Sequence, residues 1–454
     1  MNSVNHSESG YPDPAYAWYV VVVLFLAYTN AYIDRQCINL LVEPIKHDLQ
    51  LNDTEISLLQ GFAFVFFYTV FGIPLGRLAD RRNRRVVVAI GVFFWSMMTA
   101  LCGLTRSFWS LFTARVGVGI GEACLSPAAY SLIADYFPKE KRGLPISFYA
   151  MAIYFGSGLA AIVVGYVIDI VSHADTIVLP WLGAMRPWQL TFFMVGLPGL
   201  ILTAIVMATV REPPRQEMTA QVGDPGAGGH LSMTATAGYF LQRWRTYASL
   251  FVGYALKASI SYGYLAWIPS MFIRTFNWSA GEIGRRFGLV VAVFGTLGIL
   301  IGGYLAHRLV LRGRYDSYLR ISIIGAIVAM LCGVPAMLTP DPYLALVLLA
   351  PVMACLGASV GIAPAATSFI APNQLRGQAI ALYIFVVALV GMNCGPTSVA
   401  LLTDYVFKDA ALVRYSLALF TVAYGVAACA VLRLGFKPYT RSAAELHGAG
   451  TPAT

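Results

Sequence analysis

The sequence predicts an all-α membrane protein of twelve transmembrane helices, arranged as two pseudo-symmetric six-helix bundles. Three observations lead to this fold class. The 454 residues are 58% hydrophobic and only 12% charged, whereas about 25% of a soluble domain is charged. Twelve apolar runs are long enough to cross a bilayer. Finally, the second half of the chain repeats landmarks of the first half in the same order.

The apolar runs predict helices rather than barrel strands. A transmembrane helix needs roughly 20 mostly apolar residues, whereas barrel strands alternate over about 10. The runs are uniformly apolar and cover residues 17–42, 56–78, 86–105, 108–134, 144–170, 189–210, 247–273, 286–307, 319–338, 342–366, 377–402 and 415–434.

The polar segments define the predicted domains. Residues 1–16 form an N-terminal tail without Lys or Arg, unlike the start of a secretory signal. Residues 17–210 form the first six-helix bundle and 247–436 the second. Between them, 211–246 is a Pro-, Gly- and Ala-rich linker, with a short amphipathic helix expected around YFLQRW, and 437–454 is a tail.

Cationic residues predict the orientation. Lys and Arg are concentrated in loops on the side of the termini, for example in RLADRRNRR at 77–85 and HRLVLRGR at 307–314. The positive-inside rule therefore places the linker and both termini in the cytoplasm. The net charge of +9 is a topology signal, and no nucleic-acid partner is expected. The short loops favour a bacterial inner membrane, and we expect a monomer surrounded by membrane lipids.

The two halves share equivalent positions. GRLADR at 76–81 matches GYLAHR at 303–308, which lies 227 residues further on. RG opens the fifth run at 142–143 and the eleventh at 376–377, and Asp169 and Asp404 close these runs, with offsets of 234 and 235. Tandem six-span halves are typical of transporters that rock around a central site.

These motifs resemble those of the major facilitator superfamily. GRLADRRNRR at 76–85 resembles its loop signature Gly-x-x-x-Asp-Arg-x-Gly-Arg-Arg, and RVGVGIG at 115–121 resembles its fourth-span motif. The resemblance covers essentially the whole chain and implies the major facilitator fold. Asn83 stands where the signature has Gly, and we expect it to adopt a left-handed turn. His307 stands where the second copy could carry an acid.

A closer likeness is to the Spinster branch, in a bacterial-type member. Its members carry Asp-Arg in span one, here Asp34 and Arg35, and Arg and Glu two turns apart in span four, here Arg115 and Glu122. APNQLRGQAIAL at 371–382 also looks like theirs. This likeness implies a transporter of lysolipids or sphingoid-base phosphates.

The buried charges suggest a mechanism. A charge near the middle of the membrane costs roughly 2.5–3.5 kcal/mol and persists when it is paired or faces water. Asp34 and Arg35 point about 100° apart, so each needs a partner on another helix. Arg115 and Glu122 share one face of span four. We expect these four residues to line a central cavity; the alternative is a static network that joins two helices.

The resulting site hypothesis has three parts. Proton coupling is assigned to Asp34, with Glu122 as second choice. The anionic head group is expected to contact Arg35 or Arg115, and further substrate-binding residues are Ser126, Lys257, Tyr262 and Asn393. Lys257 either faces the cavity or extends to the membrane surface. Ser261 and Tyr264 are further candidates for the C-terminal wall; for any single tyrosine, packing in the core is the favoured alternative.

A cytoplasmic gate is expected from the loop signature. Asp80 would face the positive N-terminus of span eleven near Gly377, and Arg81, Arg84 and Arg85 would pair with Asp135 and Glu140. Such contacts hold the cytoplasmic side shut in the superfamily; the alternative is a topology signal alone. The predicted gate consists of Gly76, Asp80, Arg81, Arg84, Arg85, Asp135, Arg142 and Gly377.

The function predicted from the sequence is proton-coupled secondary active transport of an amphipathic anion, such as a lysophospholipid or sphingoid phosphate, by alternating access. A small organic anion or a drug-like compound is the alternative cargo. An enzyme or a receptor is a more distant alternative, because the six His residues are scattered and no metal-type or catalytic spacing occurs. No cofactor or metal is expected, and the proton gradient is the energy source.

Overall fold

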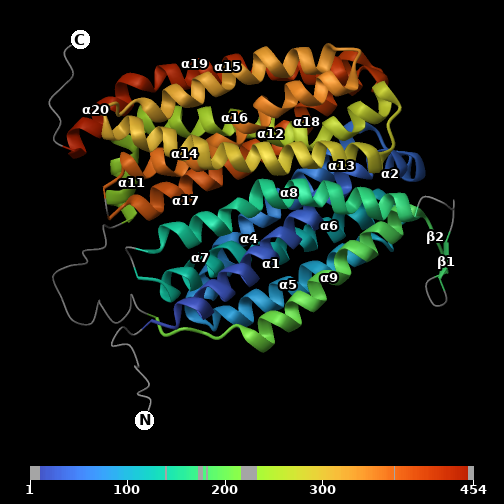
Figure 1. Ribbon diagram of the computed structural model, residues 1–454, viewed down its shortest axis with the longest axis horizontal. Coiled ribbons are helices and arrows are strands. Elements are labelled where there is room, and N and C mark those ends of the chain that lie inside the picture. Colours follow the sequence, from blue (N-terminus) through green and yellow to red (C-terminus); the bar gives the residue numbers. More distant parts are fainter. Residues whose placement is uncertain are drawn as a thin grey trace.

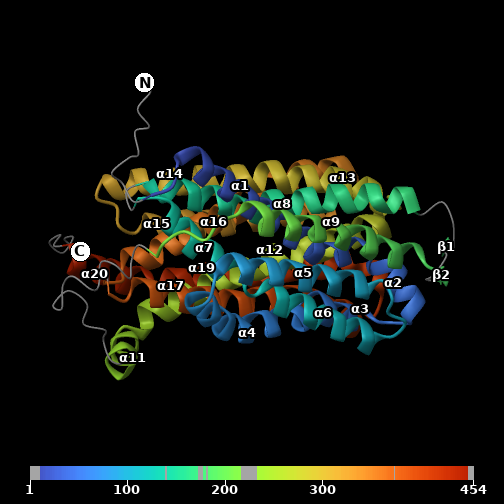
Figure 2. The same ribbon diagram turned by 90° about the horizontal axis from the view of Figure 1, so that it is seen from below.

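The computed structural model describes residues 11–138, 141–171, 177–179, 183–215, 233–372 and 374–447. Helices α1 to α9 form one bundle and α11 to α20 form the other, and the two lie side by side (Figure 1). We call the end where α1 begins and α20 ends the terminal end. The end that carries α2 and the β-hairpin is called the opposite end (Figure 2). The predicted two-bundle fold is thus confirmed.

The first bundle contains nine described helices and a hairpin. The helices are α1 (Pro14–Leu40), α2 (Val42–Leu49), α3 (Asp53–Gln60), α4 (Phe62–Arg81), α5 (Arg84–Cys102), α6 (Phe108–Glu122), α7 (Leu125–Tyr136), α8 (Gly143–Val171) and α9 (Pro187–Thr209). Strands β1 (Ile177–Leu179) and β2 (Gly183–Met185) pair antiparallel, with Val178 opposite Ala184.

The second bundle includes π-helical turns within its spans. Its elements are α11 (Met233–Gln242), α12 (Trp244–Phe276), α13 (Ala280–Val290), η2 (Val291–Gly295), α14 (Thr296–Leu311), α15 (Ser317–Leu338), α16 (Pro342–Phe369), α17 (Arg376–Val386), η3 (Val387–Met392), α18 (Asn393–Leu401), η4 (Leu402–Phe407), η5 (Ala410–Leu412), α19 (Val413–Leu434) and α20 (Phe436–His447). The predicted short helix of the linker corresponds to α11 and the start of α12.

Eleven helical segments of the described chain are long and apolar enough to cross a membrane. They correspond to eleven of the twelve predicted spans. The twelfth, α12, has 33 residues but is not among the eleven. Lys257 and several serines and tyrosines make α12 less apolar than the other spans. Several of these polar residues line the central cavity.

Local sequence signals fix where the helices begin. Asp13 caps α1 through the backbone N–H groups of Ala15 and Tyr16, and Pro14 occupies the first turn. Asn52 and Glu55 form a capping box at α3. The expectation of a left-handed Asn83 is wrong. Its φ is −66°, and its side chain instead caps α5 by accepting from Val86 N at 3.2 Å.

Small residues set how closely the bundles approach. A Cβ added at Gly158 of α8 would lie 2.4 Å from both Ala292 N and Gly288 O, in the second bundle. Within the first bundle, one added at Gly119 would lie 2.5 Å from Phe64 O. These glycines therefore allow the helices to pack in direct backbone contact.

Candidate functional site

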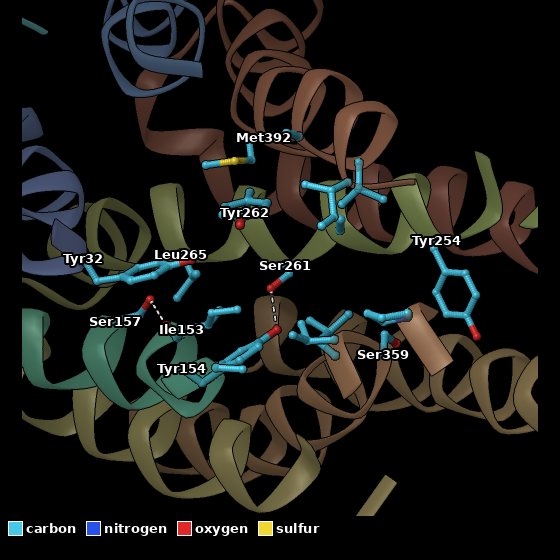
Figure 3. A pocket seen from close by; sticks show the side chains of 18 of the residues that line it. Tyr32, Ile153, Tyr154, Ser157, Tyr254, Ser261, Tyr262, Leu265, Ser359 and Met392 are labelled. Atoms are coloured by element: carbon cyan, nitrogen blue, oxygen red, sulfur yellow. Dashed lines mark hydrogen bonds between the residues drawn. The ribbon is translucent and has the colours of Figure 1, made fainter. Parts of the chain in front are cut away.

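A cavity of about 260 Å³ lies between the two bundles. α1, α4, α7 and α8 supply one wall, and α12, α16, α17 and η3 supply the other. In Figure 3 the hydroxyls of Tyr154 and Ser261 meet across the bundles, 2.8 Å apart. Hydroxyl groups are plentiful in the lining: Tyr28, Tyr32, Tyr68, Tyr130, Tyr154, Tyr254, Tyr262 and Tyr383, with Ser126, Ser157, Ser261 and Ser359.

The rest of the lining is mainly aliphatic, and its two charged residues are both cations. Arg35 belongs to the first bundle and Lys257 to the second. The aliphatic residues include Ile153, Leu265 and Leu356. A mostly apolar pocket with a few polar groups that fix orientation is the usual form of a small-molecule site. The cation content favours a ligand with a negative group.

Arg35 is held by Glu122, whereas the sequence predicted only that both belong to one network of four charged residues. The guanidinium donates to the Glu122 carboxylate at 2.5 Å, and both residues are buried. The guanidinium also lies over the rings of Phe64, at 4.3 Å, and Tyr32, at 4.8 Å. Ion pairing and cation–π contacts together compensate a charge removed from water. The pair is therefore neutral overall while Glu122 is ionised.

Asp34 lies behind the cavity wall rather than on it. Its side chain is 0% exposed, and one carboxylate oxygen accepts from Asn30 Nδ2 at 3.0 Å. The other oxygen, Oδ1, has no hydrogen-bond partner in the described part of the chain. The expectation that Asp34 lines the cavity is wrong, because its neighbour Arg35 takes the cavity-facing side of α1 and the two point about 100° apart.

Arg115 is a brace within the first bundle. Its guanidinium donates to the backbone carbonyls of Asp34 at 3.2 Å, Arg35 at 3.4 Å and Leu59 at 3.4 Å. It is fully buried and does not line the cavity. The four charges are neighbours, as predicted, but they do not form one cavity-facing network: Arg35 and Glu122 pair, Asp34 binds Asn30, and Arg115 binds main chain.

The other predicted binding residues divide into two groups. Ser126, Tyr262 and Lys257 line the cavity, and Lys257 is 2% exposed, which excludes extension to the membrane surface. Its amine donates to Ser322 O at 2.8 Å. Asn393 does not line the cavity; it donates to Leu389 O in its own helix at 2.8 Å.

Tyr264 also lies outside the lining, so it takes the core-packing role rather than a place in the wall. It is 0% exposed, and its hydroxyl bonds that of Thr421 at 2.7 Å inside the second bundle. The lining residues of α12 recur every three or four positions and include Lys257, Ser261 and Leu265; Tyr264 lies beside this stripe, and its hydroxyl is directed to Thr421.

At the terminal end, Arg84 organises the predicted gate residues of the first bundle. It forms ion pairs with Asp135, as predicted, and with Glu212, at 2.7 Å. Arg85 instead donates to Met207 O and, through its backbone, to Glu212 at 3.2 Å. Glu212 was not predicted, because it lies in the linker. Glu140 lies outside the described residues.

The predicted contact between Asp80 and Gly377 is not formed in this conformation. Asp80, Arg81 and Gly377 are exposed, and a Cβ added at Gly377 would meet no heavy atom within 4 Å. Gly76 packs near Pro127 within its own bundle, and Arg142 donates to Phe137 O at 2.8 Å. The two bundles are therefore apart at these positions.

At the opposite end the bundles are bridged by ion pairs. Arg274 of α12 donates to both oxygens of Asp53, at 2.7 and 2.8 Å, and to Glu43 at 2.8 Å. Lys46 also contacts Asp53, which is fully buried. These residues were missed because each lies near the end of a span, where a charge is unremarkable in sequence.

Two aspartates complete this closure at equivalent positions of the repeat. Asp404 accepts from Thr54 N at 2.7 Å and from the Thr54 hydroxyl at 2.6 Å, in the first turn of α3. Asp169 pairs with Arg285 and lies beside Gly281 in the first turn of α13. Each carboxylate meets the positive N-terminus of a helix in the other bundle. Their matching places in the repeat were the available sequence signal.

The described residues contain no group of His, Cys, Asp and Glu side chains that could hold a metal ion. The cavity offers hydroxyls, aromatic rings and two cations for binding.

The fold and the cavity define a membrane transporter, and comparisons with known proteins agree. The model of the Major Facilitator Superfamily matches residues 24–396, so the chain belongs to this superfamily. An MFS-type efflux pump of Mycolicibacterium smegmatis is 32% identical over 402 residues, which is 87% of this chain and 86% of that protein. These relatives are transporters rather than enzymes.

Within the superfamily the chain is similar to transporters of the Spinster type, among others. It is similar to the crystal structure of a bacterial homologue of the human lysosomal transporter Spinster, in an inward-facing and occupied conformation, with a TM-score of 0.76 and 25% identity over 97% of this chain and 100% of that chain. A probable L-galactonate transporter of Escherichia coli is 28% identical over 300 residues, 64% of this chain and 62% of that protein.

Proposed function

We propose that this protein is a proton-coupled secondary active transporter that moves an amphipathic anion by alternating access. The observation that carries the proposal is Arg35. This cation lies in the wall of a mostly apolar cavity and is neutralised by Glu122 at 2.5 Å. The Glu122 carboxylate, which can be protonated, therefore competes with an anionic ligand for the Arg35 guanidinium.

Proton coupling follows from this competition. While Glu122 is ionised, its carboxylate occupies the Arg35 guanidinium. Protonation of Glu122 frees the guanidinium to bind a carboxylate or phosphate of the substrate. Asp34, buried one residue away and bonded to the neutral Asn30, is our preferred acid for taking up the proton, which must reach Glu122 before Arg35 is released. Transport then needs a proton gradient and no cofactor.

The lining supports an amphipathic cargo. Its aromatic and aliphatic side chains suit an acyl or sphingoid tail, and Arg35, with Ser126 and Tyr262 in the same cavity, suits a head group. Lys257 provides a cation on the other wall. A lysophospholipid or sphingoid phosphate combines both features.

A second candidate cargo is a small hydroxylated acid. Eight tyrosine and four serine hydroxyls in the lining favour it, since buried hydroxyls select ligands that can hydrogen-bond to them. The similar galactonate transporter points to the same chemistry.

The proposed orientation places the terminal end in the cytoplasm, since the cations of the loops are concentrated there. The cavity then belongs to an inward-facing state, with the opposite end closed toward the outside. A monomer in a bacterial inner membrane is the proposed setting.

The test is flux in proteoliposomes. Labelled lysophosphatidylglycerol and labelled galactonate are compared with and without a proton gradient, in the native protein and in Asp34→Asn. We expect gradient-dependent lipid flux that loses its gradient dependence in Asp34→Asn while exchange remains. Galactonate flux without lipid flux would show that the cargo is a small hydroxylated acid rather than a lipid. Lipid flux that ignores the gradient in both proteins would refute proton coupling.

A further inference from the structure

A second, smaller cavity adjoins the main one at Arg35. Its volume is about 20 Å³, which is enough for one water-sized group. Arg35 lines both cavities, together with Tyr262, Leu265 and Met392. We call the smaller cavity the amide pocket, because its other residues from the first bundle all carry side-chain amides: Gln36, Asn39 and Gln60.

The amide pocket lies on the way from the main cavity to the opposite end. Gln36 and Asn39 follow Arg35 along α1 in that direction, and Gln60 is the last residue of α3, which begins at that end (Figure 2). The wall that faces them belongs to α12, η3 and α18 of the second bundle. A molecule that moves between the bundles toward the opposite end therefore passes these amides.

Gln60 has incomplete hydrogen bonding although it is only 9% exposed. Its Oε1 is buried and has no partner within the described chain, and its Nε2 lies 3.5 Å from Ala266 O, at the long limit of a hydrogen bond. Arg35 is similar, because its Nη2 donates to Glu122 whereas its buried Nε has no described partner. A buried acceptor and a buried donor in this condition normally bind water or a ligand.

The other two amides are held by each other. Asn39 Nδ2 donates to Gln36 Oε1 within α1. This bond fixes both side chains, and it leaves the NH2 group of Gln36 and the carbonyl oxygen of Asn39 for other partners. The pocket therefore offers both donors and acceptors around a space for one water-sized group.

This mixture of donors and acceptors selects a hydroxyl. A hydroxyl both donates and accepts, whereas a carboxylate or a phosphodiester only accepts and an ammonium only donates. An anionic group in the pocket would face the amide oxygens, and a cationic group would lie beside the Arg35 guanidinium. A hydroxyl avoids both penalties, and it can replace a water molecule without loss of hydrogen bonds.

We propose that the amide pocket binds a hydroxyl group of the substrate while Arg35 binds its anionic group. The inference rests on the proposed function and narrows the substrate to an anion that carries a hydroxyl a few bonds from its charge. The phosphoglycerol head of a lysolipid and a polyhydroxylated acid share this chemistry. The polar end of the substrate then points toward the opposite end, and the remainder lies in the main cavity.

Matched ligands with and without the hydroxyl provide the test. Calorimetry on the protein in nanodiscs compares hexadecylphosphoglycerol, a lysolipid analogue, with hexadecyl propyl phosphate, which has the same charge and alkyl chain but no hydroxyl. Galactonate and hexanoate form the corresponding pair of six-carbon acids. We expect the hydroxylated member of one pair to bind at least about tenfold more tightly, which corresponds to about 1.4 kcal/mol. The pair that shows the preference identifies the source of the hydroxyl.

Removal of an amide should abolish this preference. Gln60→Leu and Asn39→Leu, on different helices, should each bring the two affinities of a pair within about twofold of each other. The ligand without the hydroxyl should still bind, and it thereby reports a folded site. Gln189→Leu is the matched control, because Gln189 is a buried amide of the same bundle that lies outside both cavities. This control should keep the native ratio of affinities.

The inference is wrong if the two ligands of each native pair bind equally, since the pocket then holds only water. A preference that survives in both Gln60→Leu and Asn39→Leu would place the hydroxyl elsewhere, and an equal loss in Gln189→Leu would indicate a packing effect. The comparison needs no proton gradient, so these outcomes are separate from a failure of proton coupling. Absence of binding by all four ligands would overturn the proposed cargoes together with the inference.

Discussion

The carboxylate of Asp404 accepts two hydrogen bonds from Thr54 across the interface between the bundles, at 2.7 Å from the backbone N–H and 2.6 Å from the hydroxyl. Because the acceptor belongs to η4 and the donors to the first turn of α3, these bonds exist only while the opposite end is closed. Asp169 and the first turn of α13 repeat the arrangement on the other side of the pseudo-symmetry axis.

We predict that Asp404→Asn shifts the protein away from this closed state by about fivefold, because a carboxylate at a helix N-terminus contributes about 1 kcal/mol. Spin labels at the exposed positions His47 and Ala411, in a background without the native cysteines, would report a longer distance. Asp409→Asn is the control, since Asp409 caps Ala411 within its own segment. An unchanged distance distribution in Asp404→Asn would contradict the prediction.

Glu122→Gln is predicted to strengthen anion binding while it abolishes coupling. The change keeps the volume but removes the charge that neutralises Arg35, and a charge-assisted hydrogen bond to the ligand is worth about 1.5–3 kcal/mol. Calorimetry should show that Glu122→Gln binds lysophosphatidylglycerol at least about tenfold more tightly than the native protein does. Its affinity should no longer vary with pH.

The matched control for that experiment is Glu282→Gln, which removes a surface pair with Arg286. Weaker binding in Glu122→Gln would mean that the carboxylate positions Arg35 rather than competes for it.

Gly158→Val should prevent closure of the opposite end. The added side chain would meet Ala292 N and Gly288 O at 2.4 Å, and backbone atoms cannot move aside as a flexible side chain can. The same labels at His47 and Ala411 should then show the separated state as the main population. Gly72→Val is a suitable comparison, because a Cβ there has no neighbour within 4 Å. A native-like distance in Gly158→Val would show that the α8–α13 contact can be relaxed at little cost.

Asp80→Ala should stabilise the conformation described above. Asp80 is exposed here and is expected to meet the N-terminus of α17 only when the terminal end closes. Its loss should therefore destabilise the conformation that is closed at the terminal end. Labels at Leu144 and Gln378 should lose their short-distance population. The comparison is Asp316→Ala, since Asp316 pairs with Arg320 in its own helix at 2.5 Å. Equal effects of Asp80→Ala and Asp316→Ala would contradict a gate role for Asp80 and favour the alternative, that the loop signature sets only the topology.

The sequence predicted the spans, the repeat and the grouping of four buried charges that includes Arg35 and Glu122, because each depends on local pattern or on a shortage of alternatives. A membrane-embedded arginine needs an acid, and few were available. It did not predict that Arg115 would bind carbonyls, because main-chain acceptors are present everywhere and leave no mark in sequence. Nor did it reveal Arg274 and Asp53, whose pairing depends on which conformation places their helix ends together.

The placement of Tyr264 and Asn393 failed for a related reason. A polar residue in an apolar span requires a partner, but the sequence does not say where that partner lies. The partner of Ser261, Tyr154, lies across the cavity, whereas the partner of Tyr264, Thr421, lies within the same bundle. The side of the helix decides, and a shift of one or two residues reverses the answer.

The glycine contact between α8 and α13 has a mechanical consequence. α8 has 29 residues, so it is about 43 Å long. Because the two backbones touch there with no side chain between them, the α8–α13 contact can serve as the point about which the bundles tilt. Gly158 lies near the middle of α8, so a tilt of about 10° about this contact would displace each end of the helix by roughly 4 Å. Breaking the few bonds that join the bundles at one face of the membrane would therefore separate the bundles at that face and bring them together at the other.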